Sequence, residues 1–129
     1  MVFLVSPPVS DEALNDLYGT AWPKHKPCGF DHVLSRSLAY ICAYDGEELV
    51  GFVYLAWDGG IHAFVLEPTV RKTHQRRGIG RRLMEEAAKV ASEKGIEWLH
   101  VDYEPHLEPF YSACGFRSTL AGLRNLRTG

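Results

Sequence analysis

The chain has 129 residues, of which 46% are hydrophobic and 23% are charged, and its formal net charge is −2. This length suits one compact domain with its own core, so we expect a single domain over residues 1–129. The composition excludes a disordered chain, and the apolar runs are too short to span a bilayer. The slight excess of acidic residues argues against a partner that is a long polyanion, and we expect no nucleic-acid partner.

The N-terminal stretch and the cysteines indicate where such a protein works. The first residues, MVFLVSPPVS, lack a basic segment before the apolar run and do not resemble a signal peptide. Cys28, Cys42 and Cys114 are odd in number and form no CxxC pair, so we expect reduced thiols and neither a disulfide framework nor a metal site. The sequence therefore favours the cytoplasm and no membrane partner.

The first third of the chain reads as a strand, a helix and an irregular stretch. Residues 2–5 are apolar and β-branched, which predicts a strand. Ser10 can cap a helix over 11–22, whose buried face would carry Leu14, Leu17 and Tyr18. Prolines and glycines then interrupt any regular pattern as far as Phe30, so we expect a mobile stretch there.

The middle of the chain has the two-residue period of strands. Residues 38–57 divide into two strand-like runs around Asp45-Gly46, a dipeptide typical of a hairpin turn. Residues 61–70 predict another strand, which Pro68 should interrupt or bulge because proline cannot donate to the ladder.

The last part of the chain predicts a helix, a strand and a second, shorter helix. Residues 81–94 place Leu83, Met84, Ala87, Ala88 and Ala91 on one helical face, and Gly95 suits the residue that ends the helix. The stretch 97–103 reads as a strand parallel to the one over 61–70. A short helix should begin near Pro109, and the tail 116–126 can supply one or two edge strands.

The stretch THQRRGIGRRLMEEA, residues 73–87, concentrates positive charge where a helix begins. Six of the fourteen Lys and Arg residues lie between Arg71 and Arg82. The first turn of a helix already presents unpaired N–H groups and the positive end of the dipole, so cations there are unfavourable without an anionic ligand. A solvated basic face and an ordinary glycine turn are the plain alternatives, and neither explains both features together.

Two familiar nucleotide-binding patterns fail at this junction. No GxxxxGK[ST] string occurs, and counting GxGxxG from Gly78 puts its third glycine at Leu83. What fits is Gln75-Arg76-Arg77-Gly78-Ile79-Gly80, which resembles the Q/R-x-x-G-x-G/A pyrophosphate loop of the GNAT superfamily of N-acetyltransferases. Residues 109–116, PFYSACGF, resemble the downstream FYxxxGF segment of that superfamily.

The resemblance implies a fold of the α/β (α+β) class. Its centre would be a mixed, mostly antiparallel twisted sheet with a V-shaped splay between strands four and five, flanked by about four helices. It also implies that acetyl-CoA binds at the splay as co-substrate, with no metal. The residues implied to bind it are Val70, Gln75, Arg76, Arg77, Gly78, Ile79, Gly80 and Arg81.

The implied reaction is direct acetyl transfer to a primary amine in a ternary complex. Tyr111 matches the tyrosine of the FYxxxGF segment, which often acts as the general acid beside the coenzyme sulfur. Glu67 lies near the end of strand four, where many relatives recruit a base, and it is our candidate. Its rivals for that role, on the two strands expected to line the splay, are His62, His100, Asp102 and Tyr103.

Three questions remain open at the level of sequence. A non-catalytic acyl-CoA-binding or sensing module would keep the loop and lack turnover. The acceptor is a small-molecule or peptide amine whose identity no residue pattern specifies. Exposed edge strands in this fold often serve dimers, so a homodimer is compatible with the sequence by analogy alone.

Overall fold

The computed structural model describes residues 1–128, and these form a five-stranded sheet in the order β1-β2-β3-β4-β5. Each of the first three neighbouring pairs is antiparallel, and β4 pairs with β5 in parallel. The mixed, mostly antiparallel sheet expected from the sequence is confirmed. The strands are β1 Val2–Val5, β2 Ala39–Asp45, β3 Glu48–Trp57, β4 His62–Val70 and β5 Trp98–His100.

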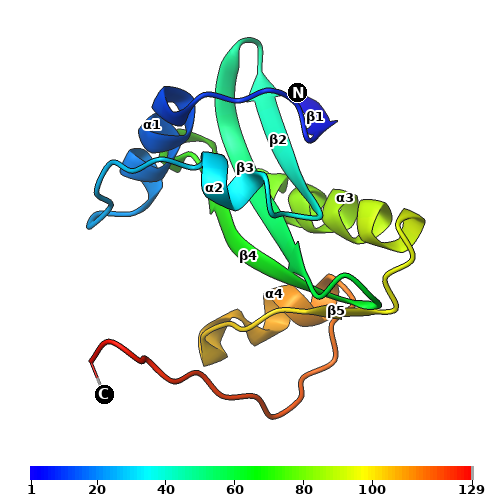
Figure 1. Ribbon diagram of the computed structural model, residues 1–129. Coiled ribbons are helices and arrows are strands. Elements are labelled where there is room, and N and C mark those ends of the chain that lie inside the picture. The colour runs from blue at the N-terminus through cyan, green and yellow to red at the C-terminus, as the bar shows by residue number, and fades with distance from the viewer. Residues whose placement is uncertain (129) are drawn as a thin grey trace.

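Helices cover both faces of this sheet (Figure 1). They are α1 Asp11–Ala21, α2 Asp31–Leu34, α3 Ile79–Glu93 and α4 Glu108–Ala113, with short 3-10 turns at Lys72–His74 and Pro105–Leu107. Helices α1 and α2 lie on one side of the sheet and α3 lies on the other. Within residues 1–128, none of the helices has the length and apolar character required to cross a membrane.

Local sequence explains where the two longer helices begin and end. Ser10 caps α1, because its hydroxyl accepts a hydrogen bond from the amide of Ala13 (3.1 Å). Helix α3 ends before Gly95, whose φ of +85° is favourable only for glycine. The predicted buried face of α3 needs one correction: Ala88 is exposed and Val90 is buried instead, which agrees with the 3.6-residue period.

Two apolar cores form on the two faces of the sheet. The larger one packs α3 against β2, β3 and β4, and it includes Leu83, Met84 and Tyr111. The smaller one packs Leu14, Leu17 and Tyr18 of α1 against the opposite face, confirming the predicted side of that helix. The sheet is thus held from both sides.

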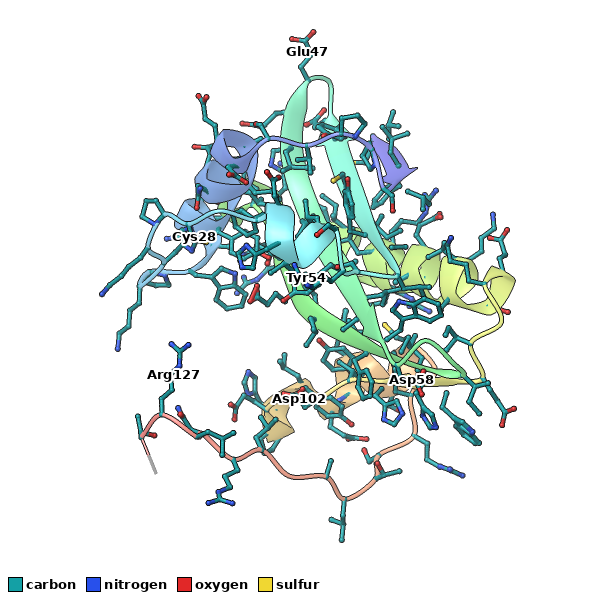
Figure 2. All side chains as sticks on the ribbon, in the orientation of Figure 1. Cys28, Glu47, Tyr54, Asp58, Asp102 and Arg127 are labelled. Carbon is teal, nitrogen blue, oxygen red and sulfur yellow. The ribbon has the colours of Figure 1, made fainter. Side chains whose placement is uncertain are left out.

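The sequence predicted a hairpin turn around Asp45-Gly46, and the structure has the hairpin with its two-residue turn at Gly46 and Glu47, because Asp45 still pairs with Glu48. Gly46 has a φ of +61°, a left-handed conformation that glycine adopts without a Cβ penalty. Glu47 marks the tip of the hairpin and Asp58 lies near the opposite end of the sheet (Figure 2). The hairpin is the centre of the fold, since β1 pairs with β2 and β4 pairs with β3.

Strand β4 contains the bulge predicted near Pro68. Leu66 pairs with Tyr54 and Thr69 pairs with Phe52, so Glu67 and Pro68 together oppose the single residue Val53. The pairing of β4 with β5 covers only residues 62–64 on β4. Beyond Phe64 the two strands diverge within the described part of the chain, which is the splay expected between strands four and five.

The C-terminal segment corrects the sequence prediction. Residues 116–126 were expected to supply edge strands, but the segment after α4 is irregular as far as residue 128 (Figure 1). Leu120, Leu123 and Leu126 are exposed by 105%, 83% and 81%, so these leucines contribute nothing to either core. β5 is also shorter than the predicted 97–103, because no neighbouring strand within residues 1–128 continues its ladder beyond His100.

Candidate active site

The junction between β4 and α3 leaves a run of backbone amides free. Gly78 is the N-terminal capping residue of α3, with a φ of +82°. The amide of His74 donates to the Arg71 carbonyl (2.8 Å), and within residues 1–128 the next amide along the chain to donate to the main chain is that of Arg82, to the Gly78 carbonyl (3.1 Å). The N–H groups over 75–81 therefore remain available to a ligand, with the positive end of the helix dipole behind them.

A cleft of about 470 Å³ lies against these amides. It is lined by the end of β4, the loop, the start of α3 and one side of α4. Its residues are Val70, His74, Gln75, Arg76, Gly78, Ile79, Gly80, Arg81, Phe110 and Ala113. Seven of the eight residues that the sequence assigned to acetyl-CoA binding therefore lie in one place.

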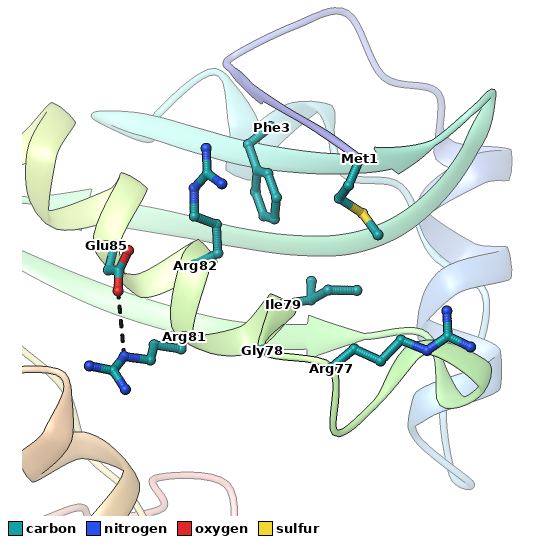
Figure 3. A pocket seen from close by; sticks show the side chains of 8 residues that line it. All are labelled: Met1, Phe3, Arg77, Gly78, Ile79, Arg81, Arg82 and Glu85. Atoms are coloured by element: carbon teal, nitrogen blue, oxygen red, sulfur yellow. Dashed lines mark ion pairs between the residues drawn. The ribbon is translucent and has the colours of Figure 1, made fainter.

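The eighth, Arg77, faces a different hollow (Figure 3). That hollow, of about 390 Å³, lies between α3 and β1, and Met1 and Phe3 form part of its wall. Arg82 lies on the same side, with its guanidinium 4.6 Å from the centre of the Phe3 ring. Arg81 lines both hollows and pairs with Glu85 at 3.4 Å.

Glycine brings the start of α3 close to the sheet. A Cβ at Gly51 on β3 would lie 3.1 Å from the Ile79 side chain and 3.2 Å from that of Leu83, which is tighter than ordinary packing. At Gly80 a Cβ would be 3.7 Å from Phe110 and 3.8 Å from Val70, an ordinary contact that would line the cleft. Gly51 thus sets the position of the loop, a role that no sequence pattern indicated.

Two side chains anchor the loop to the rest of the fold, and sequence reasoning missed both. Arg71 is buried; its Nε donates to the Leu49 carbonyl (2.9 Å) and its guanidinium pairs with Asp16 of α1 (2.8 Å). His74 is also buried, and its Nε2 lies 2.9 Å from an Asp45 carboxylate oxygen. This hydrogen bond lowers the pKa of Asp45. Both residues lie in the basic stretch between Arg71 and Arg82. The sequence could not distinguish the basic residues that anchor the loop from those that face a ligand.

Glu67 lies on the bulge, on the side of the sheet that faces α1. Its carboxylate accepts a hydrogen bond from the Tyr18 hydroxyl (3.1 Å), and its φ of +49° is unusual for a residue with a Cβ. Burial and the nearby Glu67 carboxylate raise the pKa of Tyr54 on the neighbouring strand. The exposed carboxylate can accept a proton from a ligand on this side.

The rival residues lie elsewhere around the splay. His62 and His100 face each other across the β4–β5 pair, with Nδ1 and Nε2 2.8 Å apart, and the His100 ring stacks on Phe64 (4.6 Å between centroids). This pair lies where the two strands are still hydrogen-bonded. Tyr103 bonds to Ser118 of the tail through its hydroxyl (2.9 Å). Within residues 1–128, no group of three or more His, Cys, Asp and Glu side chains has the arrangement of a metal site.

Tyr111 lies in the core on the α3 side of the sheet. Its ring stacks on Tyr103 at 4.6 Å and packs edge-on against Phe110 and Phe116. Burial raises the pKa of Tyr111, and nearby Cys114 raises it further. Phe110, its neighbour in α4, lines the cleft, whereas Tyr111 is not among the residues that line it. Tyr111 and Glu67 thus belong to the two opposite sides of the sheet.

Comparison with known proteins agrees with this geometry. The model of the acetyltransferase (GNAT) family matches residues 11–116, so the chain belongs to the GNAT family. A search of curated proteins returned no match. The chain is accordingly an acetyl-transferring enzyme, and its family uses acetyl-CoA.

Solved structures show the same fold over nearly the whole chain. A GNAT-family acetyltransferase of Streptococcus pneumoniae is 27% identical, with a TM-score of 0.76, and the match covers 97% of this chain and 98% of that one. Glucosamine-6-phosphate N-acetyltransferase of Arabidopsis thaliana is 11% identical, with a TM-score of 0.75 and coverages of 97% and 98%. AAC(6')-Iy, in complex with a CoA-S-monomethyl-acetylneamine bisubstrate analogue, is 17% identical, with a TM-score of 0.72 and coverages of 97% and 97%.

Proposed function

We propose that this enzyme transfers the acetyl group of acetyl-CoA directly to a primary amine in a ternary complex. The observation that carries the proposal is the cleft beside α3, where free amides of residues 75–81 meet Arg76 and Arg81. A diphosphate needs several donors at once, and a helix N-terminus with a glycine-rich turn supplies them. The chemistry of this donor set fits the pyrophosphate of the coenzyme.

The residues around the loop then have separate binding roles. The amides from Gln75 to Arg81 hold the diphosphate, and Arg76 and Arg81 add charge from the side chains. Val70 and Gly80 form the wall along which the pantetheine arm would run, because both line the cleft next to Phe110. Arg77 contributes only its backbone amide to coenzyme binding, since its side chain lines the hollow between α3 and β1.

The chemical step needs an acceptor for one proton and a donor of another. The amine nitrogen bonds to the thioester carbonyl carbon, and the carbon–sulfur bond breaks. At the splay between β4 and β5, where the two sides of the sheet meet, Glu67 takes the proton that the nitrogen loses, and Tyr111 gives its phenolic proton to the departing thiolate. The phenol of Tyr111 is protonated at neutral pH, and burial raises its pKa further, so the proton must be transferred in the same step in which the carbon–sulfur bond breaks. The products are the acetylated amine and the free thiol of coenzyme A.

The acceptor class is supported by the relatives whose structures hold amines. The AAC(6')-Iy complex contains a CoA analogue joined to acetylneamine, and another relative was solved with sisomicin, an aminoglycoside. Acetylneamine and sisomicin are ligands of those two proteins. For this chain we propose the shared chemical class, a primary amine, as the acceptor.

The test is acetyl-CoA-dependent thiol release over a panel of amines, amino acids, aminoglycosides and peptides. We expect release above the no-amine background for at least one member, with one acetyl group transferred per thiol released by mass spectrometry. Binding of acetyl-CoA without turnover on every amine would favour the non-catalytic acyl-CoA module. No binding of acetyl-CoA at millimolar concentration would overturn both the proposed acetyl transfer and the non-catalytic acyl-CoA module.

We also propose that the enzyme works in a reducing compartment, the cytoplasm. Cys28, Cys42 and Cys114 are free within the described residues, and Cys28 is exposed. Exposed thiols are uncommon where disulfides form readily. Thiol titration of the protein purified without reductant checks this, since three reactive thiols in denaturant are expected.

A further inference from the structure

The bulge in β4 holds Glu67 in a strained conformation. Its φ of +49° is in the left-handed region, which is unfavourable for an L-residue with a Cβ. Such strain persists only where the surrounding structure fixes it, and it is concentrated at functional sites. The question is which contacts fix Glu67.

Helix α1 and the residue that caps its C-terminus provide these contacts, through Tyr18 and Trp22. Tyr18 donates from its hydroxyl to Oε1 of Glu67 (3.1 Å). Trp22 donates from its indole N–H to the Thr69 hydroxyl (3.2 Å), which in turn donates to the Glu67 carbonyl (2.7 Å). One contact fixes the side chain of Glu67 and the other fixes its backbone.

The Tyr18 hydroxyl is well placed to act as a permanent donor. Its ring is buried among His25, Phe30 and Phe52, at centroid distances of 5.3, 5.2 and 6.1 Å. Burial raises the pKa of Tyr18, and the negative charge of Glu67 raises it further, so the phenol stays protonated. The direction of the hydrogen bond is therefore fixed, with the carboxylate as acceptor.

We infer that Tyr18 is a positioning residue that engages Oε1 of Glu67 and leaves Oε2 to accept the proton of the attacking amine. The inference rests on the proposed function of Glu67 as the base. A carboxylate held at one oxygen loses rotational freedom, which keeps its second oxygen aimed at the ligand. Its role in the reaction is exerted through Glu67, to which its hydroxyl donates.

A double-mutant cycle with Tyr18→Phe and Glu67→Gln tests the inference on the full chain. Loss of a base lowers kcat by about 100-fold or more, so Glu67→Gln should show at least that drop. Loss of one hydrogen bond corresponds to a factor of about 3–10, so Tyr18→Phe should lower kcat by that factor with KM for acetyl-CoA unchanged. In the Glu67→Gln background, Tyr18→Phe should change kcat less than about twofold, because the two residues act as one unit.

Two further variants keep the test informative. Tyr40→Phe removes a hydroxyl from the same apolar cluster, one that bonds to the Pro7 carbonyl, and kcat should be unchanged. If Tyr18→Phe does not fold, Trp22→Phe replaces it, because Trp22 is 44% exposed and its loss disturbs the core less. Trp22→Phe should also lower kcat in the native background and not in the Glu67→Gln background.

Each outcome has a distinct meaning. An equal drop in kcat from Tyr18→Phe in both backgrounds would overturn the inference, since the effect would be general and structural. A native kcat for Tyr18→Phe, with a large loss for Glu67→Gln, would overturn only the positioning role. A native kcat for Glu67→Gln would overturn the base assignment and the positioning role together, while acetyl transfer itself would stand.

Discussion

The side-chain amide of Gln75 donates a hydrogen bond to the main-chain carbonyl of Val70 at 3.1 Å. This contact joins the last residue of β4 to the loop that precedes α3, across the turn that contains Arg71 and His74. Both ends of the contact line the cleft. The contact therefore fixes the loop relative to the strand along which the coenzyme arm is proposed to lie.

Gln75→Met should weaken coenzyme binding without unfolding the protein. Methionine keeps the length of the side chain but has no N–H donor, so the loop loses its link to Val70. The loss of one exposed hydrogen bond predicts a Kd for coenzyme A that is about 3–10 times larger. Isothermal titration calorimetry measures it, and an unchanged Kd would show that the loop keeps its position without the link.

Gly78 and Gly80 should respond differently to alanine. Gly78→Ala forces a Cβ into a left-handed conformation, which should cost about 1–2 kcal/mol and lower Tm by several degrees. Gly80→Ala meets only ordinary contacts within α3, so Tm should hold or rise, yet its methyl group enters the cleft and should weaken coenzyme binding. Thermal unfolding and calorimetry on both variants check this, and equal Tm losses would contradict it.

Arg82 lines only the hollow beside β1, whereas its neighbour Arg81 lines both hollows, so Arg82 is the matched control for Arg81. Arg81 lines the cleft, whereas Arg82 lies over Phe3 and pairs with Glu86 at 3.0 Å. Arg81→Gln should raise the Kd for coenzyme A by about 2–5-fold, the range for an exposed charge, and should reduce its dependence on salt. Arg82→Gln should leave the Kd unchanged; a larger effect from Arg82 would place the diphosphate in the other hollow.

The pH dependence of turnover tests the role of Tyr111. An acid catalyst is active while protonated, and the raised pKa of Tyr111 keeps the phenol protonated beyond its ordinary value of about 10. We therefore expect no fall in kcat from this group below about pH 10. Tyr111→Phe should lower kcat at all these pH values with little change in KM for acetyl-CoA, and full activity in this variant would exclude the acid role.

The raised pKa of Tyr111 also predicts how the stability of the protein depends on pH. Because the folded state holds the Tyr111 proton more tightly than the unfolded chain, the stability that depends on the neutral phenol is complete below about pH 10 and is lost as the pH rises above it. Tyr111→Phe should reduce this alkaline loss. Urea unfolding of both proteins between pH 8 and about pH 11 measures the difference.

The exposed leucines of the C-terminal segment test whether that segment joins an assembly. Changing Leu120, Leu123 and Leu126 to serine should alter stability by no more than about 0.5 kcal/mol each, because exposed side chains contribute little. The molar mass from light scattering should also stay the same. A fall in mass or a large fall in Tm would show that these leucines pack against a second copy.

The sequence predicted local turns and helix ends more reliably than it predicted the pairing of the last segment with the sheet. The glycine-rich loop at 75–80 could be located because a glycine pattern and clustered arginines are local features. Most of its residues line one cleft, and its binding of the coenzyme stays a prediction. The bulge at Glu67 and Pro68 was predicted because proline removes a donor at a known position. The strands expected at 116–126 were wrong, since pairing depends on a partner elsewhere in space.

By itself, the sequence determined the hairpin between β2 and β3, the cap of α1 and the glycine-rich start of α3, because turns, caps and periodicity are set by residues that are neighbours in the chain. Only the tertiary structure decided that Arg77 faces away from the cleft, that Arg71 and His74 are anchors, and that Tyr18 bonds to Glu67. These contacts join residues such as Tyr18 and Glu67 that lie 49 positions apart. Their geometry follows from the packing of α1 and the hairpin on the sheet, which no local pattern encodes.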